Sequence, residues 1–478
     1  MTSLRPFFVA GKRRQTDESF AVTHPGDGSF IADVAVPKAG DIDEAVEAAH
    51  VVQHQLEGSS ALVRARALDH VSAQLARRRQ EIAEVITSES GKPIRWAQAE
   101  VQRSVATFRI AAEETRRFSG ELMRLDTEEG YEGRLALVRR FSRGPVLAIA
   151  PFNFPLNLVA HKVAPAIAVG APVIIKPAPT TPLSSLLLGE ILAETELPEG
   201  SWSVLPVRND QMADLVSDPR LPVISFTGSA DIGWMIREMV PRKHVTLELG
   251  GNGTAVVCAD YSSEADLEYA AGRIAKFAMY QAGQSCISVQ TVLADESLYE
   301  RLRDKVAAAV AAQPVGDVWD PNTSVGPMIS EAAAERVEQW VQRAASSGAK
   351  ILTGGHRDKA LFGPTLLTDV DAQTEIATEE VFGPVVSISP VAGFDAAVER
   401  INSSRYGLQA GVFTHDIATA FQAHRALQVG GVIIGDVPTF RADQMPYGGV
   451  KDSGIGREGV AAAMTDMTYE RVLVLNGL

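Results

Sequence analysis

The stretch GPVLAIAPFNFPLNLVAHKVAPAIAVGAPVIIK, residues 144–176, decides the fold. It contains two short, continuously apolar runs, residues 145–150 and 173–175, separated by a segment of helical character that begins at Asn157. Runs of this kind are typical of strands that are buried on both faces. A third run, residues 223–226, is again followed by a helical pattern. Strands that alternate with helices of this length predict βαβ units and a parallel sheet.

A second α/β series follows the first along the chain. Residues 245–249 and 254–257 read as strands and bracket Gly250-Gly251, which predicts a hinge between two domains. The second series extends to about residue 440, and residues 468–474 are rich in strand-forming types that need a pairing partner.

Composition excludes several classes of protein. The chain has 478 residues, 46% of them hydrophobic, and a net charge of −14. This acidic balance argues against a nucleic-acid partner, because phosphate backbones attract Lys and Arg. Two cysteines make neither a disulfide scaffold nor a Cys-rich zinc site. The most apolar stretch, residues 163–175, is broken by prolines and a glycine and is shorter than the ~20 residues of a membrane span. We therefore expect a cytoplasmic protein without a metal or a membrane partner.

One of the two cysteines has a reactive context. Cys286 lies in AGQSCI, residues 282–287, where Gly283 permits a tight turn of the backbone. A thiolate attacks a carbonyl carbon well, but a free thiol with a pKa of about 8.5 is mostly protonated at neutral pH. It therefore needs a base or an electropositive surrounding. The alternative is a buried structural thiol, which is the commoner fate of a lone cysteine.

Two further residues suit a reaction at a carbonyl group. Glu248 is flanked by apolar residues, so its pKa would be raised and it could act as a general base; an ion pair at a strand end is equally compatible. Asn153 follows a buried strand in PFNFP, residues 151–155, and its rigidly held amide could donate to a developing oxyanion. Alternatively, Asn153 caps the following helix.

Phosphate-binding features are present in the first series. The segment FTGSADIG, residues 226–233, has the order strand, turn, helix, so its backbone N–H groups could receive a phosphate; the alternative is a simple turn capped by Ser229. Lys176 ends the run 173–175, at the edge where open parallel sheets bind ligands. It could contact a ribose hydroxyl or a phosphate, or be an exposed lysine. GIGREG, residues 454–459, is not read as a dinucleotide loop, because no strand precedes it.

Taken together, these segments resemble the NAD(P)-dependent aldehyde dehydrogenase superfamily over nearly the whole chain. The branch that they resemble most includes lactaldehyde, phosphonoacetaldehyde and non-phosphorylating glyceraldehyde-3-phosphate dehydrogenases. The motifs that carry the resemblance, in the family's order, are PFNFP at 151–155, FTGSADIG at 226–233, ELGG at 248–251, GQSC at 283–286, EEVFGP at 379–384 and the loop at 445–459.

The resemblance implies an aldehyde dehydrogenase-like α/β fold, with two α/β domains that have open parallel sheets and a small β oligomerisation element. Residues 1–119 and 144–249 would form the cofactor-binding domain, and residues 250–442 the catalytic domain. Residues 120–143 and 460–478 would form the oligomerisation element. In the family its last strand joins the sheet of a neighbouring subunit, which implies a homodimer or homotetramer.

The family's mechanism falls on residues already described. Cys286 would attack the aldehyde carbon, and Asn153 with the backbone N–H of Cys286 would hold the oxyanion. After hydride transfer to the nicotinamide, Glu248 would activate the water that hydrolyses the thioester. Glu380 would bind the nicotinamide ribose, and Phe382 would lie near the ring. The cofactor-binding residues that the resemblance implies are Phe152, Lys176, Pro179, Gly228, Ser229, Gly233, Glu380 and Phe382.

Departures from the family bear on specificity. Pro179 stands where many NAD-preferring members have a glutamate, so a 2′-phosphate is not repelled. We expect NAD or NADP as the cofactor, with NAD slightly favoured. Ser285 stands where members that act on phosphorylated aldehydes tend to have arginine, which argues against a strongly anionic substrate. Arg109, His161 and Arg441 could line the substrate tunnel; ion pairing or exposure is the alternative for each.

The expected function is the NAD(P)-dependent oxidation of a small aldehyde to its carboxylic acid. A CoA-acylating enzyme is one alternative; Glu248 disfavours it, because acylating relatives usually lack a base that hydrolyses the thioester. A catalytically silent binding or structural relative is the other. The presence of Cys286, Glu248 and Asn153 together disfavours it.

Overall fold

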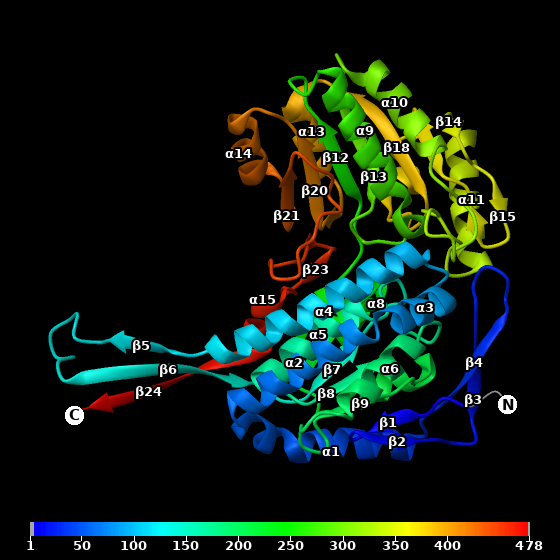
Figure 1. The fold of residues 1–478 in the computed structure, drawn as a ribbon. Helices are drawn as coiled ribbons and strands as arrows, with labels where there is room; N and C mark the ends of the chain where they lie inside the picture. The colour runs from blue at the N-terminus through cyan, green and yellow to red at the C-terminus, as the bar shows by residue number, and fades with distance from the viewer. Residues whose placement is uncertain (1–3, 477–478) are drawn as a thin grey trace.

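The computed structural model describes residues 4–476, which form two α/β parts and an extended β arm (Figure 1). The first part is built on an eight-stranded sheet with the order β2-β1-β9-β8-β7-β10-β11-β23. Its strands are β1 (Phe7–Val9), β2 (Lys12–Arg14), β7 (Val146–Ile149), β8 (Val173–Lys176), β9 (Trp202–Val204), β10 (Val223–Thr227), β11 (His244–Glu248) and β23 (Gly454–Ile455).

Helices cover this sheet, and a separate hairpin lies beside it. The hairpin is β3 (Ser19–Thr23) with β4 (Phe30–Ala35). The helices are α1 (Ala39–Gly58), α2 (Ala61–Arg77), α3 (Arg79–Ser90), α4 (Ile94–Arg117), α5 (Asn157–Val169), α6 (Leu183–Leu192), α7 (Met212–Ser217), α8 (Ala230–Met239) and α15 (Val460–Asp466).

The second part is built on a seven-stranded sheet with the order β14-β17-β18-β13-β12-β20-β21. Its strands are β12 (Gly253–Val257), β13 (Val289–Asp295), β14 (Lys350–Thr353), β17 (Thr365–Thr368), β18 (Val385–Val391), β20 (Gln409–Phe413) and β21 (Gly431–Ile434). Its helices are α9 (Glu264–Met279), α10 (Tyr299–Ala311), α11 (Glu331–Ser346), α12 (Glu375–Thr378), α13 (Gly393–Asn402) and α14 (Ile417–Ala426). Two short ladders complete it: β15 (Arg357–Asp358) with β16 (Leu361–Phe362), and β19 (Tyr406–Gly407) with β22 (Val450–Lys451).

The arm is a three-stranded antiparallel sheet that projects from the first part (Figure 1). The C-terminal strand β24 (Thr468–Asn476) pairs along its length with β6 (Arg134–Ser142), which also pairs with β5 (Glu121–Arg124). The predicted strand 468–474 thus has its pairing partner inside the chain. The first three residues of the predicted cofactor-binding domain, 1–3, and the last two of the predicted oligomerisation element, 477–478, lie outside the described residues.

The predicted open parallel sheets are present, and their edges are antiparallel. Strands β9, β8, β7, β10 and β11 run parallel, as do β17, β18, β13, β12, β20 and β21. At the edges, β1, β2, β14 and β23 pair antiparallel with their neighbours. Except for the buried apolar strand β1, these edge segments show no continuous apolar run, because only strands buried on both faces have that pattern.

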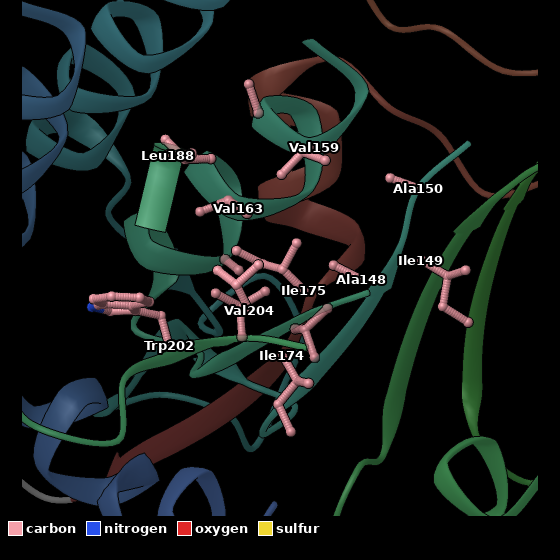
Figure 2. Packing of buried hydrophobic residues seen from close by; sticks show 14 of the residues in the cluster. Ala148, Ile149, Ala150, Val159, Val163, Ile174, Ile175, Leu188, Trp202 and Val204 are labelled. Atoms are coloured by element: carbon pink, nitrogen blue, oxygen red, sulfur yellow. The ribbon is translucent and has the colours of Figure 1, made fainter. Parts of the chain in front are cut away.

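The core of the first part lies where α5 and α6 cover strands β7 to β9 (Figure 2). Val163 of α5 and Leu188 of α6 are fully buried together with Ile174 of β8 and Val204 of β9. Each such side chain contributes about 1.5–3 kcal/mol through its burial. All residues of α5 are buried, which is typical of a helix inside a core. Its polar residues therefore need partners inside the protein.

Within residues 4–476, no helix is both long and apolar enough to cross a bilayer.

Candidate active site

The candidate residues converge where the first sheet ends and the chain passes into the second part. Lys176 and Glu248 are the last residues of β8 and β11, and Asn153 lies in the loop after β7. Parallel strands place such residues along one edge of the sheet. From Glu248 the chain passes through Gly250-Gly251 into β12, and a Cβ atom on Gly251 would lie 2.8 Å from the carbonyl oxygen of Cys286. The link therefore brings Cys286 to the same edge.

A strained turn carries Cys286. Gln281 and Ala282 have positive φ angles of 52° and 53°, and Gly283 follows at 68°. A side chain at Gly283 would overlap the carbonyl oxygen of Gly383, so this glycine is required by both its backbone angle and its surroundings. The turn is pinned to the Asn153 loop, because Gln281 Nε2 donates to the carbonyl of Asn153. Strain of this kind is typical of functional sites.

Gly283→Ala should displace Cys286 and lower the rate of aldehyde oxidation at least tenfold, because the added methyl group must push the turn away from Gly383. Gly272→Ala is the matched control: Gly272 lies in α9 with no atom near its Cβ position, and alanine favours a helix by up to about 1 kcal/mol. Turnover and thermal unfolding of both variants check this prediction. An active Gly283→Ala enzyme with an unchanged melting temperature would contradict it.

Asn153 does not cap the helix that follows it. The first amides near the start of α5, those of Leu156 and Asn157, donate instead to Glu100 Oε1 at 3.0 Å each. Asn153 Nδ2 donates to the carbonyl of Gln284, also at 3.0 Å. A primary amide carries two N–H hydrogens. One therefore fixes the side chain beside the Cys286 turn, and the other, which has no partner within residues 4–476, can donate to an oxygen at the site.

The thiol of Cys286 is partly buried and faces a tyrosine. Its Sγ atom lies 3.0 Å from the hydroxyl of Tyr447. Burial raises the pKa of Cys286 to about 12, while the hydrogen bond with Tyr447 and the charge of Arg441 lower it. The resting thiol is therefore protonated at neutral pH and needs a proton acceptor before it can attack.

Glu248 is buried with an unsatisfied carboxyl group. Within residues 4–476 neither of its oxygens has a hydrogen-bond partner, so the alternative of a structural ion pair finds no support. Burial, followed by the negative charge of Glu458, holds the pKa of Glu248 well above its usual value. A Cβ atom on Gly448 would lie 2.9 Å from Glu248 Oε1, so a glycine there leaves room beside the carboxyl. The group has the surroundings of a base that acts near neutral pH.

A buried charge cluster surrounds Glu248, and the sequence analysis missed most of it. Lys162 of α5 donates to Glu458 Oε1 at 2.8 Å and to the hydroxyl of Thr227 at 2.7 Å. Arg441 donates to Glu458 Oε2 at 3.1 Å. Although burial raises the pKa of Glu458, the two cations hold it well below its usual value. A lysine inside an otherwise apolar helix was the available signal, since such a residue needs a buried partner.

The residues expected to bind the dinucleotide lie at the ends of β8 and β10. Lys176 is buried, not exposed; its Nζ atom lies 3.5 Å from Asn209 Oδ1, and burial lowers its pKa to about 8. Ser229 precedes α8, but its hydroxyl caps no amide of that helix in the described structure, so the helix N-terminus is free to face a phosphate. Side chains at Gly228 and Gly233 would overlap Phe226 and Leu249. Pro179, beyond Lys176, is exposed.

Glu380 contacts the link, and Phe382, two residues later, packs against Phe152. Glu380 Oε1 accepts a hydrogen bond of 3.3 Å from the amide of Gly251, and burial raises its pKa to about 7. The rings of Phe152 and Phe382 pack edge to face at 5.8 Å. The two predicted segments, 151–155 and 379–384, therefore meet across the two parts of the chain.

Of the three substrate candidates, two lie in the buried site and one does not. His161 Nε2 lies 3.0 Å from Asp443 Oδ1, and burial, followed by the charge of Arg441, lowers its pKa to about 4, so it is neutral. The side chain of Arg441 is 6% exposed and lies over the ring of Tyr447. Arg109 is exposed on α4 in an ion pair with Glu113, and no contact within the described residues joins it to the other two.

Comparison with known proteins identifies the family. The model of the aldehyde dehydrogenase family matches residues 12–473. The chain belongs to the aldehyde dehydrogenase family. It is 39% identical to 3-sulfolactaldehyde dehydrogenase of Priestia aryabhattai over 471 residues, which are 98% of this chain and 97% of that one.

Two solved structures of aldehyde dehydrogenases support the same assignment. Aldehyde dehydrogenase 21 of Physcomitrella patens, in complex with the reaction product succinate, is 43% identical with a TM-score of 0.98, covering 100% of this chain and 99% of that one. The NADP-dependent glyceraldehyde-3-phosphate dehydrogenase of Bacillus halodurans, in complex with NADP, is 33% identical with a TM-score of 0.95 over 100% of both chains. The predicted family and fold are confirmed, and so is NAD(P)-dependent oxidation of a small aldehyde as the class of reaction.

Proposed function

We propose that this aldehyde dehydrogenase oxidises a short aldehyde that bears an acidic group, through a thioester on Cys286. Cys286 loses its proton to water, and the thiolate forms a bond to the aldehyde carbon while the carbonyl electron pair moves to the oxygen, beside the second N–H of Asn153. Lys176 and the N-terminus of α8 would hold NAD(P), which would accept the hydride that leaves the aldehyde carbon. Glu248 then takes a proton from water, whose oxygen attacks the thioester and releases the carboxylic acid and the thiol.

The charge of the buried cluster carries the proposal for an acidic substrate. Lys162 and Arg441 both donate to one carboxylate, that of Glu458, and burial raises the pKa of Glu248, which lowers its share of negative charge. The cluster thus has an excess of positive charge in a medium of low dielectric constant, where a nearby anion is strongly stabilised. Within residues 4–476, Arg441 Nε has no partner and is a free donor for such an anion.

Ser285 does not exclude an acidic substrate. An arginine is absent directly before Cys286, but Arg441 supplies a guanidinium to the same site from a distant segment. Two relatives support an acidic substrate by their names: one acts on 3-sulfolactaldehyde, and the other was solved with succinate as its reaction product.

A panel of short aldehydes tests the substrate. We expect an aldehyde with a terminal carboxylate or sulfonate to have a kcat/KM at least tenfold above that of an uncharged aldehyde of the same length. Arg441→Gln should abolish this preference, whereas Arg109→Gln, on the exposed face of α4, should change it less than threefold. Equal kcat/KM values for the charged and uncharged aldehydes in the wild type, or a loss of the preference only in Arg109→Gln, would contradict the proposal.

The same panel run with and without CoA tests acyl transfer. Formation of acyl-CoA would contradict hydrolysis by Glu248.

We propose that the enzyme accepts both NAD and NADP. Pro179 places no carboxylate beside the adenosine ribose, so a 2′-phosphate meets no like charge from this position. The slight preference for NAD stays a prediction, and kcat/KM measured with each cofactor tests it.

We also propose a cytoplasmic location, supported by the unpaired state of Cys258 and Cys286.

The three parts take the roles that the resemblance implies, with the arm as the oligomerisation element. Strand β24 lies at the edge of its sheet, and the side chains of Val472, Leu473 and Val474 are each more than half exposed. A long apolar edge strand is a template for pairing with another chain. We therefore expect a homodimer or homotetramer by light scattering. A monomer at micromolar concentration would contradict this role of the arm.

A further inference from the structure

We propose that Tyr447 is a positioning residue for the nucleophile, whose hydroxyl aims the Cys286 sulfur and favours its thiolate. This inference rests on the proposed role of Cys286. The observation that carries it is the distance of 3.0 Å between Tyr447 Oη and Cys286 Sγ. Within residues 4–476 it is the one hydrogen bond that the sulfur makes.

The backbone of Tyr447 is fixed. Its amide donates to the carbonyl of Glu458 at 2.9 Å, and the amide of Glu458 donates back to the carbonyl of Tyr447 at 2.7 Å. Because the side chain of Glu458 also binds Lys162 and Arg441, the tyrosine is anchored to the charge cluster around Glu248.

The ring of Tyr447 is held as firmly as its backbone. The guanidinium of Arg441 lies over the ring, 3.8 Å from its centroid. Ile287 and Leu408 pack against the ring, and the residue is 3% exposed. The hydroxyl therefore cannot turn away without disturbing these contacts, so its position is a fixed property of the site.

The chemistry of the two groups sets the direction of the hydrogen bond. A thiol and a phenol can each donate, but a thiolate can only accept. Once the proton leaves Cys286, Tyr447 must donate to the sulfur, and a hydrogen bond to a charged acceptor is stronger than one between neutral groups. The guanidinium over the ring draws electron density from the phenol and makes it a better donor. The bond thus gains strength when the nucleophile forms.

The charged groups that face the Cys286 sulfur have opposing effects on its pKa. The carboxyls of Glu380 and Glu248 oppose a thiolate, and Arg441 favours it. Tyr447 adds a favourable contact at the sulfur itself. If Tyr447 served only for packing, its hydroxyl would not be needed. A phenylalanine would fill the same space without placing an extra polar group in the core.

Alkylation of the thiol by iodoacetamide in Tyr447→Phe tests this inference, because phenylalanine keeps the ring and removes only the hydroxyl. From about pH 6 to pH 10 the alkylation rate of Cys286, followed by mass, should rise with pH in both enzymes, with the variant about tenfold slower at each pH, equivalent to one pKa unit. The kcat/KM for the aldehyde should fall to a similar extent, with an unchanged Kd for the cofactor.

Tyr299→Phe is the matched control. The hydroxyl of Tyr299 is 2.5 Å from that of Thr368 in the second part, so this variant also loses one tyrosine hydroxyl hydrogen bond, but its alkylation profile should match the wild type. A Tyr447→Phe profile that superimposes on the wild type, or lies above it, would overturn the inference. The alkylation assay needs no aldehyde, so its failure would leave the proposed function standing. Turnover in a Cys286→Ala enzyme, by contrast, would overturn the proposed function.

Discussion

Replacing Cys286 with alanine should lower aldehyde oxidation by about 10⁴-fold or more while the cofactor still binds. Asn153 binds the carbonyl of Gln284, two residues before Cys286, and loss of a covalent nucleophile typically removes nearly all the catalysis that its partners support. Lys176 at the end of β8 and the N-terminus of α8 are unchanged by the substitution, so the dinucleotide Kd should change less than twofold. Steady-state reduction of NAD(P) and a fluorescence titration of the cofactor measure the two quantities.

Cys258→Ala is the control for this result. Cys258 is buried in a cluster of its own, where burial and nearby aspartates raise its pKa to about 12. Unlike Cys286, it has neither a hydrogen bond nor a cation within residues 4–476 that lowers its pKa, so we expect it to be inert. We expect full turnover and a loss of stability of about 1 kcal/mol from the small cavity. Full residual activity in Cys286→Ala, or loss of activity in Cys258→Ala, would show that Cys286 is not the nucleophile.

Glu248→Gln should separate the two halves of the reaction. The amide is of similar size but cannot take a proton from water, and loss of a general base typically costs 10²–10⁴-fold. Acylation should still reduce one equivalent of NAD(P) per subunit in a rapid burst, after which turnover should be at least about 100-fold slower than in the wild type. Stopped-flow absorbance of the reduced cofactor measures both phases.

Glu89→Gln makes the same chemical change at another buried carboxyl. Glu89 accepts from the amides of Leu183 and Ser184 at the start of α6, and burial raises its pKa to about 8. This variant should show no new slow phase, because its carboxyl supports a helix rather than a reacting atom. If Glu248→Gln loses the burst as well, its carboxyl serves the attack of the thiol rather than the hydrolysis.

The parallel core could be predicted because its signals are local. The runs 145–150, 173–175 and 223–226 correspond to β7, β8 and β10, and the helical segment expected from Asn157 begins there as α5. Strands buried on both faces need apolar side chains at every position, so a short window of sequence identifies them. The antiparallel edge strands β2 and β23 lack that constraint, and the sequence analysis did not find them.

The candidate site was only partly accessible to sequence reasoning, for a physical reason. Cys286, Glu248 and Asn153 lie in motifs whose composition suggests chemistry, whereas Tyr447 and Glu458 gain their meaning from partners that are distant along the chain. Tyr447 meets Cys286 across 161 positions, and Lys162 meets Glu458 across 296. Such pairings depend on how segments that are far apart in the sequence pack against each other. No pattern within one segment encodes them.

Arg441 is a residue whose role the sequence could only partly predict. The sequence analysis named it as a substrate residue with ion pairing as the alternative, and the structure shows the ion pair with Glu458 together with a second contact over Tyr447. A buried guanidinium can hold a carboxylate and still present an unused N–H to a ligand, because it has five donors. The two interpretations are therefore compatible, and only the geometry could show this.

The central claim is a covalent acyl thioester on Cys286 that awaits hydrolysis by Glu248. The most direct test is the intact mass of Glu248→Gln, quenched in acid after mixing with NAD(P) and an aldehyde that the enzyme oxidises. We predict an increase equal to the acyl group, located on the peptide that contains Cys286 and absent when the cofactor is left out. An unmodified protein in a variant that still shows the burst, or an adduct on another residue, would contradict the account.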